Sequence, residues 1–532
     1  MEIRVLLRAV VLCAIPALGL SQSLTLSGYV VDGLTNRPLL GIRMHLYAWE
    51  NSDSYPLGSH GPAAAPVASD SEGRFSFAHL SRGRYALQAE LAHEIYAYGE
   101  SVDPFHRNTV LVTEESEGQP ILFRILPRAT IQVSVHDEQG DVPDYVGVLL
   151  YRRARNNGRL QMLYAGSAGV DPLGRYTFAD VWPGDYLVCA TPPGALLGSF
   201  APSGASEVEY HPGGESRVYV ESCFPDAKSP GALLHISSGE RRDLDLKLRS
   251  AQSVTIRTNV LAGLFPANLP HMGPTIDPDT NDPESDRWQL RNVPPGSYIL
   301  YAETGDRSGK DPGSVVRRPI LVESAPLTLE LAPEKRGSIE VHVQPSDGRT
   351  VLEGPAVWFL SSDAQTKVYY SRMTGPHTFD PGDYWLSIRP KPPFCAISQT
   401  LSGGTIRDGK ITVTPGMSAR LDVGLGTNCG VVDVRAVSNG DPVPFADFLL
   451  LVNGTPQEPG DVVTGSMDAH GRASIPRMPP GQYWLWAWVP SGDGYLGPDL
   501  SNAMAQAVEV VVVAGQLASV SVDPMRSPGE SK

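Results

Sequence analysis

The chain has 532 residues, of which 41% are hydrophobic and 19% are charged, and its formal net charge is −15 at pH 7. This length exceeds what one hydrophobic core organises, so several domains are expected. The acidic balance, without a basic cluster, excludes nucleic acid and anionic lipid as expected partners, because both are held mainly by Lys and Arg.

The chain opens on a stretch typical of a secretory signal. Arg4 and Arg8 precede an apolar run over residues 9–20, and the small residue Ser21 follows. The run is too short for a membrane-spanning helix of about 20 residues. We therefore expect residues 1–21 to be a signal peptide of a bacterial secreted protein, destined for the periplasm, the cell surface or the extracellular medium. No later stretch is expected to cross a membrane.

One phrase recurs along the chain and predicts a strand, a tight turn and a second strand. It reads "DSEGRFSFAHLSRGRYALQAE" from Asp70, "DPLGRYTFADVWPGDYLVCA" from Asp171, "DRWQLRNVPPGSYILYAE" from Asp286 and "DAHGRASIPRMPPGQYWLWAWVP" from Asp468. Alternation with period two on both sides of a Gly or Pro-Gly turn is typical of paired strands. The tyrosine after the turn recurs at Tyr85, Tyr186, Tyr298, Tyr384 and Tyr483, the fourth in an eroded copy. The intervals between successive tyrosines of this series match whole small sandwich domains and are longer than solenoid repeats.

Each of these units is also expected to open with a strand pair. The first does so in "LSGYVVDGLTNRPLLGIRMHLYAW", and weaker versions start at Ala129, Gly337 and Gly430, whereas the third unit has a blurred opening near Ser253. Helical periodicity is scarce. The predicted domains are residues 22–127, 128–250, 251–334, 335–427 and 428–523, followed by a polar tail, 524–532.

The first unit carries motifs of a known family. "GYVVDGLTNRPLLG" from Gly28 fits the pattern G-x-V-x-D-x-x-T-x-x-P-L-x-G, and D-x-x-G-x-F-x-F-x-x-L and G-x-Y-x-L follow. The chain in this respect resembles the carboxypeptidase regulatory-like domain family. The resemblance implies a transthyretin-like (immunoglobulin-like, Greek-key), seven-stranded β-sandwich, grouped with Cna-B-type and carbohydrate-binding-like folds. We therefore expect an all-β tandem array of about five such sandwiches.

Four cysteines lie beyond the predicted signal peptide. Both pairs have the same spacing, and the first cysteine of each pair lies on or just beyond the strand after a "PGDY" phrase. An even number of cysteines in an exported chain favours disulfides. The expected bonds are Cys189–Cys223 and Cys395–Cys429, and the alternative is four buried thiols.

No catalytic or metal-binding motif stands out. None of the 12 histidines begins H-x-x-E or H-E-x-x-H, the zinc motifs that a peptidase would need. A Cna-B-type isopeptide bond is excluded from the first and fifth units, because the first lysine is Lys228 and residues 428–523 contain none. Lys247 and Lys410 leave that bond open in the middle units. We expect no catalytic residue, no metal and no cofactor.

An acidic stretch and an aromatic strand remain as candidate sites. "DPDTNDPESD" from Asp277 to Asp286 has acids at alternate positions, but it lacks the turn glycine and the bidentate glutamate of an EF-hand, so a solvated loop is the preferred interpretation. In "YWLWAWVP", alternation places Trp484, Trp486 and Trp488 together on the face opposite the core. Such a strip could stack on the rings of a polysaccharide, or it could pack against the fourth unit or a long loop.

The sequence predicts a non-catalytic, secreted or envelope-associated protein with a binding or scaffold role. Its expected partner is a polysaccharide or a protein of the cell envelope. Polysaccharide binding through the three tryptophans of the fifth unit is the alternative, and a hydrolase with a site assembled between domains is a remote one.

Overall fold

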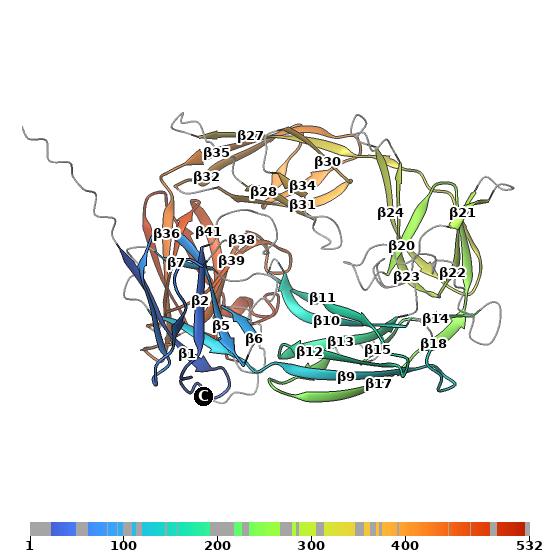
Figure 1. The fold of residues 1–532 in the computed structure, drawn as a ribbon. Coiled ribbons are helices and arrows are strands. Elements are labelled where there is room, and N and C mark those ends of the chain that lie inside the picture. The colour runs from blue at the N-terminus through green and yellow to red at the C-terminus, as the bar shows by residue number, and fades with distance from the viewer. Residues whose placement is uncertain are drawn as a thin grey trace, which may run out of the picture. The chain divides into compact units, whose positions relative to one another are not determined.

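The computed structural model shows an all-β chain (Figure 1). The structure describes residues 23–48, 62–81, 83–92, 94–98, 109–112, 120–143, 146–156, 158–191, 217–225, 233–266, 279–282, 287–304, 313–345, 356–361, 369–371, 375–390, 393–444, 446–468, 470–489 and 497–526. A 3-10 helix, Met504–Gln506, accompanies the strands. No helix within these ranges has the length and hydrophobicity of a membrane span. The predicted signal peptide, residues 1–21, lies outside the described residues.

By compactness the chain divides into two units. The smaller comprises Met1–Val30, Pro38–Tyr98 and Thr109–Ile121, and the larger comprises Val31–Arg37, Gly99–Asn108 and Leu122–Lys532. We call the five segments that carry the recurring phrase the first to fifth repeats. The first contains β1 (Leu24–Asp32), β2 (Arg43–Ala48), β3 (Val67–Ala68), β4 (Arg74–Leu80), β5 (Gly83–Leu91), β6 (Glu94–Ala97), β7 (Thr109–Val112) and β8 (Ile121–Ile125). In the smaller unit β1 pairs with β4, and β2 pairs with β3 and β5.

The remaining repeats belong to the larger unit. The second contains β9 (Ala129–His136), β10 (Gly147–Asn156), β11 (Arg159–Gly169), β12 (Arg175–Val181), β13 (Gly184–Thr191), β14 (Arg217–Val220), β15 (Ser222–Phe224), β16 (Leu234–Ile236), β17 (Arg241–Lys247) and β18 (Arg249–Gln252). The third contains β19 (Val254–Thr258), β20 (Ala262–Pro266), β21 (Asp279–Asp282), β22 (Arg287–Val293), β23 (Gly296–Thr304), β24 (Ser314–Val322), β25 (Leu327–Leu329) and β26 (Glu334–Lys335).

The last two repeats complete the strand order. The fourth contains β27 (Gly337–Pro345), β28 (Ala356–Ser361), β29 (Tyr369–Ser371), β30 (Gly375–Phe379), β31 (Gly382–Arg389), β32 (Cys395–Ser402), β33 (Ile406–Arg407), β34 (Lys410–Val413) and β35 (Ser418–Gly426). The fifth contains β36 (Gly430–Ser438), β37 (Asp441–Pro442), β38 (Asp447–Gly454), β39 (Pro459–Ser466), β40 (Arg472–Met478), β41 (Gly481–Trp488), β42 (Val508–Val512) and β43 (Leu517–Val522).

The second to fifth repeats share one strand arrangement. Each opening strand lies between an antiparallel and a parallel neighbour, in the orders β12-β9-β17, β22-β19-β25, β30-β27-β35 and β40-β36-β43. The second strand pairs with the strand after the recurring turn, as in β10-β13 and β38-β41. Because each opening strand pairs with a strand near the end of its repeat, each repeat is closed by its own backbone hydrogen bonds. This arrangement is consistent with tandem β-sandwiches, while their number and strand count stay predictions.

The two sheets of a repeat enclose an apolar layer between them. In the fourth repeat, Figure 1 shows β27 and β35 in one layer and β28, β31 and β34 in the other. Alternate residues point inward, so Val341, Phe359 and Leu386 from three strands are buried together. Burying each such side chain contributes roughly 1.5–3 kcal/mol. The predicted alternation therefore corresponds to a core-facing side of each sheet.

The recurring tyrosine ties down the turn that precedes its own strand. In the five repeats its hydroxyl donates a hydrogen bond to the backbone carbonyl four residues earlier, with oxygen–oxygen distances of 2.5 to 2.9 Å. The pairs are Tyr85–Ser81, Tyr186–Trp182, Tyr298–Pro294, Tyr384–Asp380 and Tyr483–Pro479. Each ring is buried. Its hydroxyl finds a partner and the turn carbonyl is satisfied at the same time, which explains why this part of the phrase recurs.

The aspartate that opens the phrase builds the other turn. One carboxylate oxygen accepts hydrogen bonds from the backbone N–H groups two and four residues later, at 2.8 to 2.9 Å, in Asp70, Asp171 and Asp468. The glycine three residues on has a positive φ of 68° to 73°. A Cβ atom there would lie 2.3 to 2.7 Å from a backbone oxygen of another segment of the same repeat. Only glycine fits this position, because it tolerates both the conformation and the close approach.

The acidic stretch differs from its prediction. The loop interpretation is wrong for Asp279–Asp282, which form β21 and pair antiparallel with β22. The rest of "DPDTNDPESD", residues 277–278 and 283–286, lies outside the described residues.

Two predicted domain boundaries fall inside strands, 250/251 in β18 and 334/335 in β26. Periodicity did not reveal these short strands because four or fewer residues carry little alternation.

Candidate functional site

The contacts that distinguish the repeats lie on one face of the strand after the recurring turn. The tyrosine and every second residue of that strand face the core, so the residues between them point to the opposite side, which we call the outer face. In the larger unit these strands are β13, β23, β31 and β41. Their outer faces carry Cys189 in β13, Tyr301 and Glu303 in β23, Trp385 and Ser387 in β31, and Trp484, Trp486 and Trp488 in β41.

The three tryptophans of β41 lie where alternation predicted them. Tyr483 and Leu485 belong to the core between the sheets, whereas the tryptophans belong to a separate apolar cluster on the outer face. Leu449 and Leu451 of the neighbouring strand β38 complete that cluster from the same sheet.

The outer-face cluster of the fifth repeat is covered. Trp486 and Trp488 are 0% and 1% exposed, and Leu500 and Ala503 pack on them. The Trp486 indole N–H donates to the backbone oxygen of Ala503 at 3.1 Å. A Cβ atom on Gly497 would lie 2.6 Å from the Trp488 ring, so the backbone itself lies against the indole. Residues 497–507 therefore form the cover, which matches the loop-packing alternative.

A side chain of the second repeat also reaches this cluster. Arg155 donates to the backbone oxygens of Gly158, at 2.6 Å, and Pro498, at 2.5 Å. Its guanidinium lies 5.8 Å from the centre of the Trp488 ring. An indole buried on both sides offers no face to a sugar ring, and only Trp484 is partly exposed. The ligand-binding role of the three tryptophans stays a prediction, and the burial of two of them favours packing.

Asp447 lies on the same outer face, directly opposite Trp488. Its carboxylate accepts a hydrogen bond from Ser466 at 2.6 Å. Burial raises the pKa of this carboxyl to about 6, although Ser466 and the charge of Arg124 lower it in part. Within the described residues its second oxygen and the Trp488 indole N–H have no hydrogen-bond partner. Sequence reasoning missed this group, since a single aspartate in an apolar strand carries no motif.

The outer face of β31 packs against the fifth repeat. Trp385 is buried, and a Cβ atom on Gly460 of β39 would lie 2.4 Å from its ring. The Lys410 ammonium lies 5.4 Å from the centre of the same ring and pairs with Glu458 at 3.3 Å. Glycine at position 460 therefore allows the indole to lie flat on the backbone of β39.

Hydrogen bonds join the same two repeats beside Trp385. The Ser387 hydroxyl donates to the Asp461 carboxylate at 2.6 Å, and both side chains are buried. The Asn453 side-chain amide donates to the backbone oxygen of Leu386. Buried polar groups left without partners cost roughly 1–3 kcal/mol each, so these groups require the neighbouring repeat to be in place.

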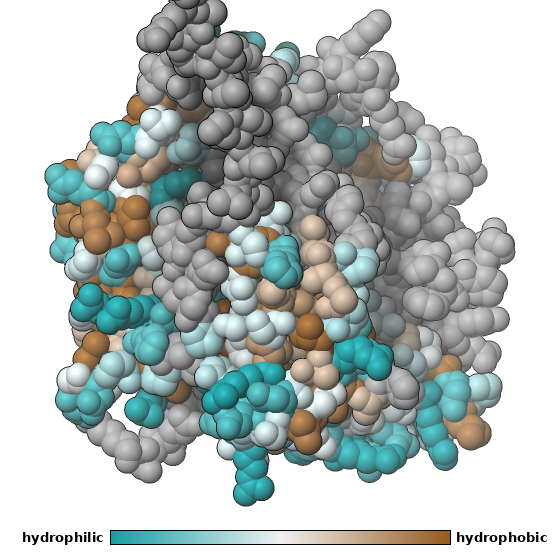
Figure 2. All heavy atoms as spheres, turned by 60° about the vertical axis from the view of Figure 1, so that its left-hand side comes forward, coloured by the Kyte–Doolittle hydropathy of each residue, from teal (hydrophilic) through white to brown (hydrophobic). Residues whose placement is uncertain are grey.

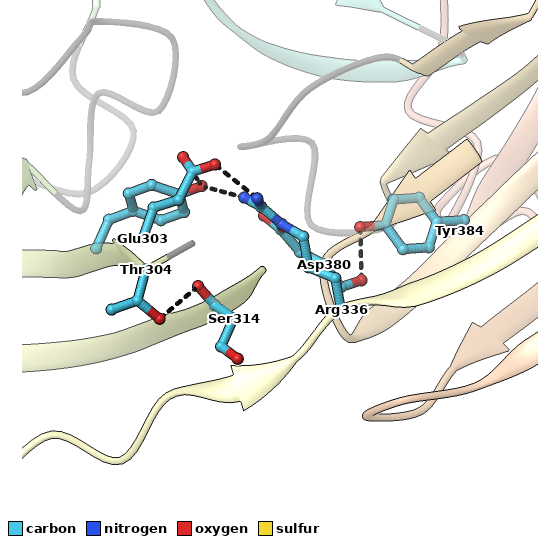
Figure 3. A network of polar contacts seen from close by, with 7 residues as sticks. Glu303, Thr304, Ser314, Arg336, Asp380 and Tyr384 are labelled. Carbon is cyan, nitrogen blue, oxygen red and sulfur yellow. Dashed lines mark hydrogen bonds and ion pairs between the residues drawn. The ribbon is translucent and has the colours of Figure 1, made fainter. Parts of the chain in front are cut away.

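Arg336 organises the connection between the third and fourth repeats (Figure 3). It lies between β26 and β27, and its guanidinium donates to Asp380 at 2.7 Å and to Glu303 at 2.6 Å. The hydroxyl of Tyr301 accepts a third hydrogen bond at 3.1 Å. Burial alone would lower the pKa of Arg336, but hydrogen bonds to Glu303 and Asp380 outweigh it and raise the pKa. Asp380 also supplies the carbonyl that Tyr384 binds, so the network and the recurring turn share a residue.

Both predicted disulfides are present. Cys189–Cys223 joins β13 to β15, where the two residues face each other directly. Cys395–Cys429 joins the start of β32 to the connection after β35. Glu221, which sequence reasoning did not single out, lies 3.8 Å from the Cys223 sulfur, and burial raises the pKa of its carboxyl to about 7. The signal that could have found it is its position two residues before Cys223, on the same face of the chain.

The visible surface is mixed in polarity. Figure 2 shows apolar side chains of the described residues interspersed with polar ones on this face. The most exposed large apolar side chains come from different repeats and include Leu40, Leu173, Leu321 and Leu517. Single exposed apolar residues are normal on proteins and identify no binding surface.

Comparisons with known proteins give a similarity to solved structures only. No protein-family model and no curated protein matches the chain. Similar structures include the Bacillus anthracis TIE protein, which is 12% identical with a TM-score of 0.16 over 95% of this chain and 76% of that one. The minor pilin of Streptococcus agalactiae is 13% identical with a TM-score of 0.21 over 43% and 96% of the two chains. Two B repeat units of the Staphylococcus aureus collagen binding protein are 11% identical with a TM-score of 0.14 over 76% and 100%.

Whole-chain similarity at this level carries no conclusion about function. The resemblance to the carboxypeptidase regulatory-like domain family likewise stays a prediction.

Proposed function

We propose that the chain is a non-catalytic scaffold protein of the bacterial envelope or the extracellular medium, built from five tandem β-sandwiches. The observation that supports this proposal is that side chains on the outer faces contact neighbouring repeats. Their distinctive side chains bind other parts of the same chain, at Arg336 between the third and fourth repeats and at Trp385 between the fourth and fifth. Groups occupied in this way fix one repeat on the next, which is what a rigid scaffold requires.

The two disulfides fit this role. Cys189–Cys223 closes a loop within the second repeat, and Cys395–Cys429 ties the fourth repeat to the connection that leads into the fifth. Loops of this length contribute roughly 3–4 kcal/mol in the chain-entropy model. Disulfides persist in oxidising compartments, which supports a location outside the cytoplasm. The acidic charge, −15 for the whole chain, keeps such a protein soluble and disfavours nucleic acid as a partner.

Distance measurement by pulsed electron paramagnetic resonance tests the fixed connection. Spin labels on cysteines introduced at Leu321 in the third repeat and Ile397 in the fourth, both exposed, report on their relative position. We expect a narrow distance distribution in the parent chain and a broad one in Arg336→Ala. Arg318→Ala, which removes an exposed arginine of β24, is the matched control and should leave the distribution narrow. A broad distribution in the parent chain would contradict a fixed scaffold.

Polysaccharide binding is the second candidate, and it depends on Trp484 because, of the three tryptophans of β41, only this one is partly exposed. A pull-down of the mature chain on insoluble and soluble polysaccharides, beside Trp484→Ala, separates the two functions. Retention that is lost in this variant, with an unchanged melting temperature, would favour the polysaccharide role. We expect no retention of either protein.

A further inference from the structure

We propose that the outer face of the second repeat holds a zinc site that is closed by the Cys189–Cys223 disulfide and becomes available when this bond is reduced. The ligands are the two sulfurs and the carboxylate of Glu221. This inference is independent of the scaffold function, since it concerns metal binding within one repeat and not the contacts between repeats.

The three groups are already gathered by the fold. Cys189 in β13 and Cys223 in β15 are directly opposite each other in the antiparallel pair, with 4.0 Å between their Cα atoms. Glu221 lies directly before β15, and one of its carboxylate oxygens is 3.8 Å from the Cys223 sulfur. The two sulfurs and one carboxylate oxygen lie within 4.8 Å of one another. Zinc–sulfur bonds of about 2.3 Å in a tetrahedron need sulfurs roughly 3.8 Å apart, so side-chain rotation after reduction suffices.

The surroundings of the three groups exclude water on one side. Leu149, Tyr151 and Leu187 form a buried cluster with Cys189, and Met162 and Cys223 pack against it. An apolar shell of this kind strengthens the attraction between a cation and thiolates, because it lowers the local dielectric constant. The donor set also fits, since two thiolates and a carboxylate are ligands that zinc takes in proteins.

A second observation comes from Tyr151. Its side chain is 3% exposed, and its hydroxyl has no hydrogen-bond partner among the described residues. Zinc with three protein ligands keeps a fourth position for water. A water held there is a partner of the kind that this buried hydroxyl lacks.

A dithiol is the reductant that opens the Cys189–Cys223 disulfide. The dithiol gives up two electrons and two protons and becomes a cyclic disulfide, while the Cys189–Cys223 bond breaks and each sulfur takes one proton. Zn²⁺ then replaces the two thiol protons, which are released to the solvent, and binds two thiolates and the Glu221 carboxylate. Reoxidation by an oxidised dithiol runs the same steps backward and expels the metal.

The second disulfide of the chain is a built-in control. The sulfur neighbours seen at Cys395 and Cys429 are backbone oxygens of Gly426 and Pro393, which supply no carboxylate or imidazole. In the part of the chain that the structure describes, Cys189, Glu221 and Cys223 are the only three metal-binding side chains whose ligand atoms are gathered in this way. Metal binding at the second repeat can therefore be distinguished from a general affinity of reduced cysteines for metal, because the second disulfide offers two cysteines without a neighbouring carboxylate among the described residues.

The test is a titration of the full mature chain with Cd²⁺ and Zn²⁺ under argon, before and after reduction by a dithiol that is then removed. Cadmium–thiolate bonds give an ultraviolet charge-transfer band, and elemental analysis counts bound zinc. We expect one equivalent in the reduced chain and none in the oxidised chain. Cys395→Ser/Cys429→Ser should keep the equivalent, and Cys189→Ser/Cys223→Ser should lose it.

Glu221→Gln separates a built site from a pair of loose thiols. Even the partners of zinc ligands cost about 10- to 100-fold in affinity when removed, so a direct ligand should cost about tenfold or more. Equal affinity in Glu221→Gln, binding that follows Cys395 and Cys429, or equal binding by the oxidised chain would each overturn the proposal. Loss of the β-sheet circular dichroism spectrum on reduction would overturn it too, because the ligands are gathered by paired strands.

Discussion

Strands β5 and β41 come from the same phrase in the first and fifth repeats, and they differ on one face only. Toward the core both present a tyrosine and small or branched apolar residues, Tyr85 and Leu87 in one and Tyr483 and Leu485 in the other, and all are buried. On the outer face β5 presents half-buried positions such as Gln88, whereas β41 presents Trp486. The inner face specifies the fold, and the outer face is free to differ from repeat to repeat.

The other repeats support this division. The outer face of β13 carries a disulfide, that of β23 holds Arg336 through Tyr301 and Glu303, and that of β31 packs Trp385 on the fifth repeat. Substitutions at one position of the phrase should therefore have similar effects in every repeat on the inner face and dissimilar effects on the outer face.

The largest expected effect on the outer face is that of Trp486→Ala. The indole is fully buried and its N–H binds Ala503, so its removal should leave a cavity and an unpaired carbonyl and cost about 3–5 kcal/mol. Urea unfolding of the full chain, followed by the fluorescence of the remaining tryptophans, measures the loss. Gln88→Ala changes the equivalent position of β5 and should cost less than about 0.5 kcal/mol. Equal costs at the two positions would mean that the outer face of β41 contributes no more to stability than that of β5.

Gly460→Val tests the outer face of β31 from the opposite side. The added side chain would enter the space of the Trp385 ring, and such overpacking costs about 1–3 kcal/mol. Hydrogen–deuterium exchange should become faster in β31 and β39 and stay unchanged in β28. Gly169→Val is the matched control, because a Cβ atom there meets nothing within 4 Å. Unchanged exchange at β39 would mean that the two repeats do not depend on this contact.

The inner face was largely predictable from the sequence, and the outer-face contacts were not. Period-two alternation located the tyrosine strands, and it placed Trp484, Trp486 and Trp488 on one side correctly because side-chain direction is a local property. Equal spacing identified the two disulfides. The cover of Trp486 and the partners of Arg336 depend on segments that meet only in the folded chain, and no local pattern encodes which distant segment covers an apolar face.

Asp447 makes the outer face of the fifth repeat sensitive to pH. Burial raises the pKa of its carboxyl from the ordinary 3.8 to about 6 in the folded chain, so between these values the folded state binds more protons than the unfolded one. Stability should therefore fall as pH rises from about 4 to 6, by about 2 kcal/mol from this group. Asp447→Asn should remove this part of the slope.

The measurement for Asp447 is the urea unfolding midpoint of the full chain between pH 4 and pH 7, in the parent chain and in the variant. The difference between the two isolates the buried carboxyl, since carboxyls with a lowered pKa, such as Asp137, act in the opposite direction in both proteins. A difference that does not change with pH would show that Asp447 is charged throughout and has a partner.

The smallest expected losses of stability come from the inner face. They should be nearly equal from repeat to repeat, and the test compares them. Tyr→Phe at positions 85, 186, 298 and 483 removes one hydrogen bond from hydroxyl to turn carbonyl in each repeat and should cost about 0.5–1.5 kcal/mol every time. Tyr384→Phe should exceed the others, because Asp380 also binds Arg336 and a looser turn weakens that contact. Arg336→Ala combined with Tyr384→Phe should then cost less than the sum of the two changes measured by unfolding. Strict additivity would mean that the inner face and the outer face act independently even where they share a residue.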